Sequence, residues 1–243
     1  MPIRFHEDNG QEDKPNMPTI QQNLTHLHQQ IREFEIRYHR RPNSVTLLAA
    51  SKKQPLDKIK EAIDAGQHIF GENHLQDALP NIAAFEKNNL EWHFIGSVQR
   101  NKTKKIAELF SWVHGVDDIL IAKRLSDQRP KQLPPLNICL EINISHESTK
   151  SGIAPENALK LAKECLLLPH LTVRGLMAIP APKINLTDQR VELRPLKQLY
   201  DHLCENGLNL DTLSMGMSHD LEAAIAEGAT LVRIGTALFG TRI

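Results

Sequence analysis

One lysine in the first quarter of the chain could carry covalent chemistry, because it directly follows an apolar stretch. Residues 45–50 read Val-Thr-Leu-Leu-Ala-Ala, a pattern typical of a buried strand, and Ser51 and Lys52 come next. Partial desolvation at a strand end favours a neutral amine, the form that condenses with an aldehyde to give a Schiff base. Lys52 is therefore a candidate for holding an aldehyde, although a solvated lysine at a loop start fits the same letters. We expect Lys53 to point away, as a charge on the rim.

A group of small residues near the C-terminus could bind an anion. Gly235 and Thr236 follow the last apolar stretch of the chain, and backbone N–H groups with a hydroxyl at such a turn can converge on a phosphate. Ser218 ends a neighbouring run of small residues and could add a second hydroxyl, or it could be the N-cap of the helix that follows. Arg233 lies within the last strand, and the alternative to a ligand contact is a buried structural ion pair.

Other candidate groups favour structural explanations. His93 lies among aromatic residues in an apolar stretch, where a histidine is more often a core group than a catalytic one. The basic stretch 100–105 is typical of a solvated helix start, because the chain balances 29 Lys and Arg against 29 Asp and Glu and offers no positive field to nucleic acid. Cys139, Cys165 and Cys204 lack metal-binding spacing, and no zinc-protease, serine-hydrolase or nucleotide-hydrolase motif is present. We therefore expect no metal site.

The spacing of apolar residues predicts the scaffold that would position these groups. Short apolar stretches alternate with amphipathic helical patterns from residue 45 onward, and the predicted strands are 45–50, 68–70, 92–95, 112–114, 137–144, 173–179, 212–215 and 231–234. Eight such units predict a single α/β domain with a TIM-like (β/α)8 barrel. An open doubly wound sheet would carry a glycine-rich turn after its first strand, which is missing here. In a barrel the carboxyl ends of all strands share one face, where binding groups gather.

The N-terminal part predicts a leader and an extra helix. Residues 1–18 are polar and lack the apolar core of a secretory signal, so we expect a disordered leader before one domain at 19–243. Ile20, Leu24, Leu27 and Ile31 recur at helical spacing, which indicates a helix packed on the barrel in preference to a coiled-coil partner. No apolar run approaches the about 18 residues of a membrane span, and we expect a cytoplasmic protein.

Several long motifs resemble one known family. They are, in chain order, LLAASKKQP, AIDAGQHIFGENHLQD, LEWHFIGSVQRNK, INISHESTKSGI, RGLMAIPAP and LSMGMSHDLEAAIAEGATLVRIGTALFG. From about Gln22 to the C-terminus they resemble the YggS/PROSC family of pyridoxal 5′-phosphate (PLP) homeostasis proteins. The resemblance implies a barrel like the N-terminal domain of alanine racemase that binds PLP, a form of vitamin B6, without established turnover.

The resemblance also implies a set of site residues. The cofactor-binding positions are Lys52, Asn73, Ser218, Arg233, Gly235 and Thr236. Among them Lys52 would form the Schiff base, Arg233 would lie near the pyridine nitrogen, and the serine, threonine and glycine would bind the phosphate. Lys150 and, at a predicted strand end, Met177 are further candidates for handling the ligand. The family commonly has SKTKP where this chain has SKKQP, and FGENY where this chain has FGENH, which ends in His74. These differences weaken any role for a second lysine, beside Lys52, at the mouth of the site.

The predicted function is therefore a PLP-binding protein that stores, buffers or delivers the cofactor, with PLP-dependent apo-enzymes as recipients. We expect a monomer and no catalytic residue, because an arginine at the pyridine nitrogen disfavours the protonated ring that acts as an electron sink. Only seven residues follow Thr236, so we do not expect the second β-domain whose tyrosine serves racemases as the opposing base. A PLP-dependent racemase and a Schiff-base aldolase without PLP remain the alternatives.

Overall fold

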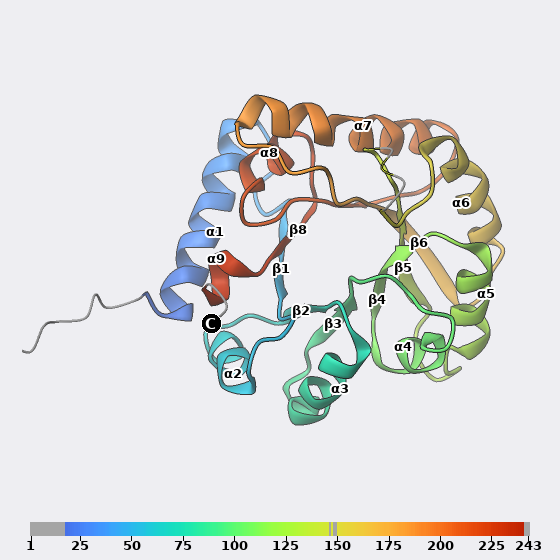
Figure 1. The fold of residues 1–243 in the computed structure, drawn as a ribbon, viewed down its shortest axis with the longest axis horizontal. Coiled ribbons are helices and arrows are strands. Elements are labelled where there is room, and N and C mark those ends of the chain that lie inside the picture. The colour runs from blue at the N-terminus through green and yellow to red at the C-terminus, as the bar shows by residue number, and fades with distance from the viewer. Residues whose placement is uncertain (1–17, 146, 148–149, 241–243) are drawn as a thin grey trace, which may run out of the picture.

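Eight parallel strands close into a barrel in which each strand lies beside the next one along the chain (Figure 1). The computed structural model describes residues 18–145, 147 and 150–240, so the predicted leader at 1–18 lies, except for Pro18, outside the described residues. The strands are β1 (Thr46–Ala50), β2 (Ile69–Glu72), β3 (Glu91–Phe94), β4 (Trp112–Val116), β5 (Leu136–Glu141), β6 (Leu171–Met177), β7 (Thr212–Ser214) and β8 (Leu231–Ile234). Pairing of β8 with β1 closes the barrel, which confirms the predicted fold.

Helices surround the barrel on its outside (Figure 1). They are α1 (Ile20–Arg37), α2 (Leu56–Asp64), α3 (Leu75–Ala84), α4 (Thr103–Leu109), α5 (Ile119–Gln128), α6 (Ala158–Leu166), α7 (Leu186–Glu205), α8 (Leu221–Ala226) and α9 (Thr236–Phe239), with 3-10 turns at Glu86–Asn88 and Pro155–Asn157. The sequence pattern predicts a turn after β8 rather than α9, because a single helical turn is too short to show periodicity.

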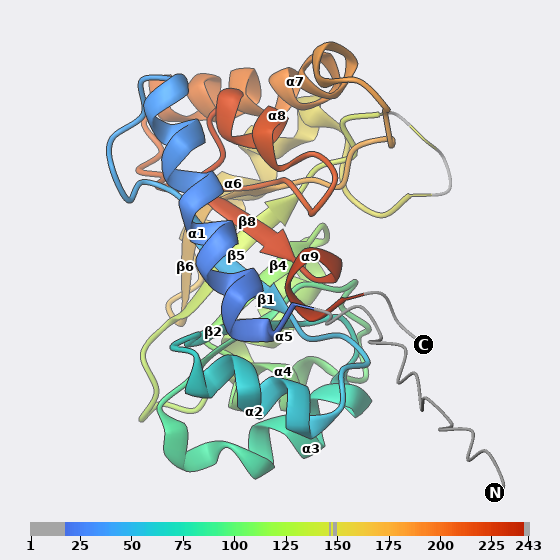
Figure 2. The ribbon, with the colours of Figure 1, turned by 90° about the vertical axis from the view of Figure 1, so that its left-hand side faces the viewer.

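The predicted N-terminal helix is present and packs on the barrel. Thr19 and Gln22 form a capping box, in which the Thr19 hydroxyl accepts from Gln22 N at 3.2 Å and Gln22 Oε1 accepts from Thr19 N at 2.9 Å. The apolar face of α1 is buried against α2, α8 and α9, and Figure 2 shows the helix running along the side of the molecule next to α9. Because this face is covered by the same chain, the coiled-coil alternative is wrong.

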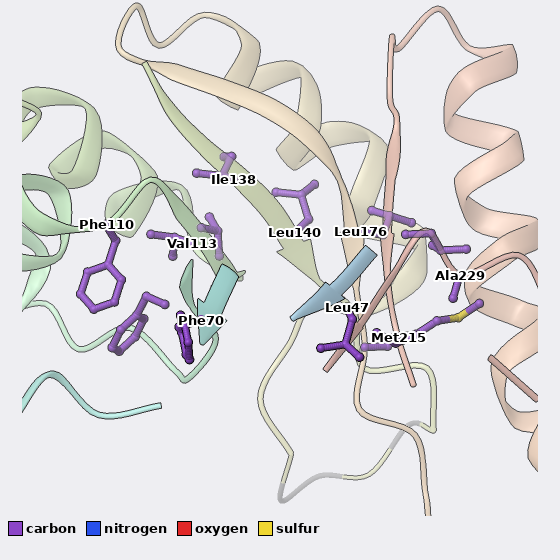
Figure 3. Close-up of a cluster of buried hydrophobic side chains, with 14 of the residues drawn as sticks. Leu47, Phe70, Phe110, Val113, Ile138, Leu140, Leu176, Met215 and Ala229 are labelled. Carbon is purple, nitrogen blue, oxygen red and sulfur yellow. The ribbon is translucent and has the colours of Figure 1, made fainter. Parts of the chain in front are cut away.

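The two faces of each strand belong to different cores, as the alternation of side chains in a strand requires. Outward-facing residues such as Val113, Ile138 and Leu176 join the large cluster between barrel and helices (Figure 3). Inward-facing residues form two small clusters, which are Leu48, Ile95 and Leu231, and Trp112, Cys139 and Met177. The barrel interior therefore has a lining of its own, which consists of these two small clusters and of polar side chains.

Within the described ranges no helix is long and apolar enough to cross a membrane. In the same part of the chain no group of three His, Cys, Asp or Glu residues is arranged to hold a metal ion. All three cysteines lie in the described part and are free, and burial raises the pKa values of Cys139 and Cys165 to about 12. Both buried thiols are therefore unreactive packing groups at neutral pH.

Candidate functional site

The cofactor-binding residues expected from the sequence line one cavity at the carboxyl ends of the strands. Its volume is about 260 Å³, and its walls are Ala50, Lys52, Asn73, Ile95, Ile179, Met217, Ser218, His219, Arg233, Gly235 and Thr236. All six expected positions are among them. The structure therefore brings together side chains from the ends of β1, β2, β7 and β8, and we refer to this space as the cofactor cavity.

A tight turn after β1 separates the two neighbouring lysines. The N–H of Gln54 donates to the carbonyl of Ser51 at 2.9 Å, which closes the turn around Lys52 and Lys53. Lys53 takes a left-handed conformation with φ of 56°, is exposed and does not line the cofactor cavity. Lys52 is half-buried and lines it. The turn thus presents one amine to the cavity and leaves the other at the rim, as expected.

Asn73 is held at the mouth by a close backbone approach. A Cβ atom at position 96 would lie 2.1 Å from the carbonyl oxygen of Asn73, so only glycine is tolerated there. Gly96 follows β3 after Ile95, and Asn73 follows β2. The two loops therefore meet closely at this rim, where Asn73 lines the cavity.

Glu72 supports this rim, although sequence reasoning did not single it out. Its side chain is fully buried, and Oε1 accepts hydrogen bonds from Ser51 Oγ at 2.6 Å and Asn81 Nδ2 at 3.0 Å. Burial raises the pKa of Glu72. One acidic side chain thus ties the end of β1, the end of β2 and helix α3 together beside Lys52. An acidic residue at the end of an apolar stretch is the signal that could have revealed it.

Arg233 is a buried cation whose partners are all neutral. Nη1 donates to the carbonyl and hydroxyl oxygens of Ser214 at 2.8 and 2.6 Å, and Nη2 donates to the carbonyl of Ala178 at 2.9 Å. No ion pair found among the described residues includes it, so the alternative of a structural ion pair is wrong. Burial lowers the pKa of Arg233 to about 10, which leaves the guanidinium charged at neutral pH.

Gly235 and Thr236, which directly follow β8, line the same cavity. The N–H groups of Gly235 and Thr236 find no hydrogen-bond partner in the described parts of the chain, whereas the N–H of Ala237 donates to Ser218 Oγ at 3.1 Å. The N-cap of α8 is Asp220, so the alternative of Ser218 as that N-cap is wrong. A turn from Met217 to Asp220 moves Ser218 away from the start of α8 and toward α9.

A second cavity of about 410 Å³ adjoins the first and shares Asn73, Ile95 and Ile179 with it. Lys150 lies in this second cavity, with its Nζ atom 2.7 Å from Glu147 Oε1. Lys150 is therefore beside the cofactor cavity and not in it.

Met177 lines neither of these cavities. It is 1% exposed and packs with Trp112 and Cys139 inside the barrel. β6 ends at Met177, two residues before the predicted strand end, and the Met177 side chain serves packing in the barrel interior. The structure therefore does not bring Met177 to the ligand space.

Glu141 also lines the second cavity, and its environment favours the neutral carboxyl. The side chain is 7% exposed, and its Oε2 atom has no hydrogen-bond partner among the described residues. Burial and the nearby charge of Asp117 raise the pKa of Glu141 to about 7, and the charge of Arg233 opposes this shift. This acid therefore titrates near neutrality next to the cofactor cavity.

Both tyrosines of the chain lie in the described part and are engaged elsewhere. The hydroxyl of Tyr38 donates to Glu222 Oε1 at 2.9 Å, and that of Tyr200 donates to the carbonyl of Leu210 at 2.7 Å. Neither lines the cofactor cavity. The cavity therefore has one amine, that of Lys52, and no phenol that could act as a second base.

Comparisons with known proteins agree with this geometry. Curated relatives named pyridoxal phosphate homeostasis protein include one from Pseudomonas aeruginosa, 53% identical over 226 residues, covering 93% of this chain and 97% of the relative. Another, from Escherichia coli K12, is 48% identical over 229 residues and covers 93% and 98%.

Solved structures of other proteins are also similar to this chain. PipY of Synechococcus elongatus PCC7942, solved with PLP bound, is 33% identical, with a TM-score of 0.80 and coverage of 91% of this chain and 100% of PipY. An alanine racemase of Clostridium difficile 630 is 14% identical with a TM-score of 0.71, and this chain spans 60% of it, which shows a shared fold. Residues 16–243 match the family described as alanine racemase, N-terminal domain. The chain therefore belongs to this family and, within it, to the pyridoxal phosphate homeostasis proteins.

Proposed function

We propose that this protein binds PLP in the cofactor cavity and takes part in PLP homeostasis, with Lys52 holding the aldehyde as a Schiff base. The observation that carries the proposal is the buried guanidinium of Arg233, which has no carboxylate partner and lines the same cavity as Lys52. A buried charge without a counter-ion is strongly unfavourable, so this environment suits a ligand rich in acceptor groups.

The lining residues fit each part of PLP. The amine of Lys52 suits the aldehyde, and the N–H groups of Gly235 and Thr236 with the hydroxyl of Ser218 suit the phosphate. The N–H donors of Arg233 suit the pyridine nitrogen, which then acts as an acceptor. Apolar walls for the ring come from Ile95, Ile179 and Met217.

The same residues support a carrier in preference to an enzyme. When bound, PLP supplies a reactive aldehyde and an electron-withdrawing ring. An arginine at the ring nitrogen keeps that nitrogen unprotonated, which weakens electron withdrawal. The relatives' shared name also points to homeostasis. We therefore propose a monomeric cytoplasmic protein that stores, buffers or delivers PLP to PLP-dependent apo-enzymes.

A PLP titration of the purified protein tests the proposal. The expected result is saturable binding with a yellow absorption band that borohydride bleaches, and loss of that band in Lys52→Ala. A Lys53→Ala variant is the matched control, because that lysine lies at the rim and should leave binding unchanged. Release of PLP to a recipient apo-enzyme, measured by recovery of the recipient's activity, tests delivery. Absence of saturable PLP binding by the wild-type protein would exclude the proposed function.

A further inference from the structure

A continuous row of polar side chains crosses the barrel interior, from the cofactor cavity to the opposite mouth. Its members, in order, are Arg233, Ser214, His114, His93 and Glu91. We propose that this row, called here the interior chain, is a proton-ordered hydrogen-bond chain that positions the Arg233 guanidinium toward the cofactor. The hydrogen bonds of the interior chain are present in the protein without ligand, so only the effect of this chain on the cofactor rests on the proposed function.

Each link of the interior chain lies at hydrogen-bond distance. Arg233 Nη1 donates to Ser214 Oγ at 2.6 Å, and Ser214 Oγ lies 2.9 Å from His114 Nδ1. His114 Nε2 lies 2.9 Å from His93 Nδ1, and His93 Nε2 lies 2.7 Å from Glu91 Oε1. The members come from β8, β7, β4 and β3, so the chain runs between opposite sides of the barrel.

The two ends of the chain determine every proton within it. A guanidinium can only donate and a carboxylate can only accept. Ser214 accepts from Arg233, and the acceptor that the described residues offer to its own proton is Nδ1 of His114. His114 then carries its proton on Nε2 and donates to Nδ1 of His93.

His93 completes the order by donating from Nε2 to Glu91. The reverse order would place an unprotonated ring nitrogen 2.7 Å from a carboxylate oxygen with no proton between them. With both rings neutral, one arrangement therefore satisfies all four links.

Burial keeps both rings neutral. His93 is 1% exposed and His114 is fully buried, and this desolvation lowers the pKa of both. The hydrogen bond from His93 lowers the pKa of Glu91, which is therefore a carboxylate at neutral pH. The interior chain therefore carries two charges, the Arg233 cation at the cofactor cavity and the Glu91 anion at the opposite mouth.

The consequence for Arg233 is a fixed orientation. Both donors of Nη1 are used by Ser214, and one donor of Nη2 is used by Ala178, so rotation of the guanidinium would break these bonds. Dipoles aligned along a buried chain strengthen one another, which stabilises a charge that has no direct counter-ion. We infer that Glu91, His93, His114 and Ser214 are positioning residues for Arg233.

The first test is independent of any ligand. Nitrogen-15 NMR of the histidines, with signals assigned from His93→Gln and His114→Gln, should show both rings neutral and protonated on Nε2 at neutral pH. The Ser214→Ala variant, a small loss of volume, should perturb the His114 Nδ1 signal in the folded protein. A proton on Nδ1 of either ring, or a cationic ring, would overturn the proposed order.

The second test uses PLP and a variant far from it. Glu91→Gln keeps the hydrogen-bond acceptor for His93 and removes only the charge, on a side chain that is 44% exposed at the mouth opposite the cofactor cavity. We expect PLP to bind about fivefold more weakly, with a shifted absorption maximum of the bound cofactor. Ser214→Ala should weaken binding about tenfold or more, because it also removes an acceptor for the guanidinium.

Asp211→Asn is the matched control. Asp211 lies at the same mouth and pairs with Arg174, but it is outside the interior chain. Its substitution should leave both the PLP affinity and the absorption maximum unchanged. Equal effects of Glu91→Gln and Asp211→Asn, or no effect of either, would overturn the positioning role. If the wild-type protein fails to bind PLP, the proposed function fails, while the NMR result still decides the order of the chain.

Discussion

The hydroxyl oxygen of Ser218 accepts a 3.1 Å hydrogen bond from the backbone N–H of Ala237, which joins the loop after β7 to the first turn of α9. Because this hydroxyl accepts from Ala237, its own proton remains available to donate. The adjacent residues Gly235 and Thr236 line the same cavity, and their N–H groups have no partner among the described residues. Ser218 thus both supports α9 and adds a donor to the candidate phosphate site.

We expect pyridoxal, which lacks the phosphate, to bind well over tenfold more weakly than PLP. Charge-assisted hydrogen bonds to a phosphate are worth about 1.5–3 kcal/mol each, so the loss of two exceeds a factor of ten. Ser218→Ala should reduce this difference in affinity, because it should weaken the binding of PLP more than the binding of pyridoxal. Ser97→Ala, in the second cavity, is the control. Absorbance titrations measure both affinities, and equal affinities for pyridoxal and PLP would contradict the site.

Lys52, and not Lys53 or Lys150, should carry the covalent link. Lys52 is the lysine that lines the cofactor cavity, while Lys53 is exposed and Lys150 lies in the second cavity. Borohydride reduction of freshly loaded protein, followed by peptide mapping, should place the pyridoxyl mass on Lys52. A pyridoxyl group found mainly on either of the other two lysines would show that the assignment is wrong.

The PLP-loaded protein should not racemise amino acids at an enzymatic rate. Inversion needs a base on each face of the reacting carbon, and both tyrosine hydroxyls are engaged outside the cofactor cavity. Loss of one acid–base group typically costs about 10²–10⁴-fold in rate. Chiral chromatography after incubation with L-alanine measures the D-isomer. Turnover near about 1 s⁻¹ that disappears in Lys52→Ala would favour the racemase alternative.

Glu141 should make the protein less stable as the pH rises. Burial and Asp117 raise its folded-state pKa to about 7 from an ordinary value of 4.5, against the effect of Arg233. A raised pKa means that the folded state holds the proton more tightly, so this contribution is fully present below pH 4.5 and is lost as the pH rises through 7. The lost stability amounts to about 3 kcal/mol.

Glu141→Gln, which cannot ionise, tests this linkage. Compared with wild type, the variant should gain relative stability between pH 5 and pH 8, as measured by urea unfolding. Glu147→Gln is a suitable control, because Glu147 is more exposed and pairs with Lys150. Parallel stability curves for wild type and Glu141→Gln over this pH range would show that Glu141 is not the group responsible.

Much of the fold follows from local patterns in the sequence. The short apolar stretch around Val113 and the helical spacing of Ile20, Leu24 and Leu27 are local features of the sequence, and patterns of these two kinds predict the barrel and its N-terminal helix. The candidate site was predictable for the same reason, because the carboxyl ends of parallel strands share one face. Lys52, Asn73 and Gly235 each follow a strand, and the cavity that they line lies at that face.

Contacts between distant segments could not be predicted from local patterns, because they form only in the closed barrel. Met177 ends β6, and the direction of its side chain depends on the register with β5 and β7, which places it in the interior. Glu91 and Arg233 are far apart in the sequence and lie on strands that do not pair, so their connection through two histidines has no local signal. The sequence by itself determined the order of the strands and helices and the exact ends of the first and last strands, because these depend on neighbours along the chain. Tertiary structure alone decided which buried polar groups meet, because hydrogen bonds across a barrel depend on closure and stagger of all eight strands.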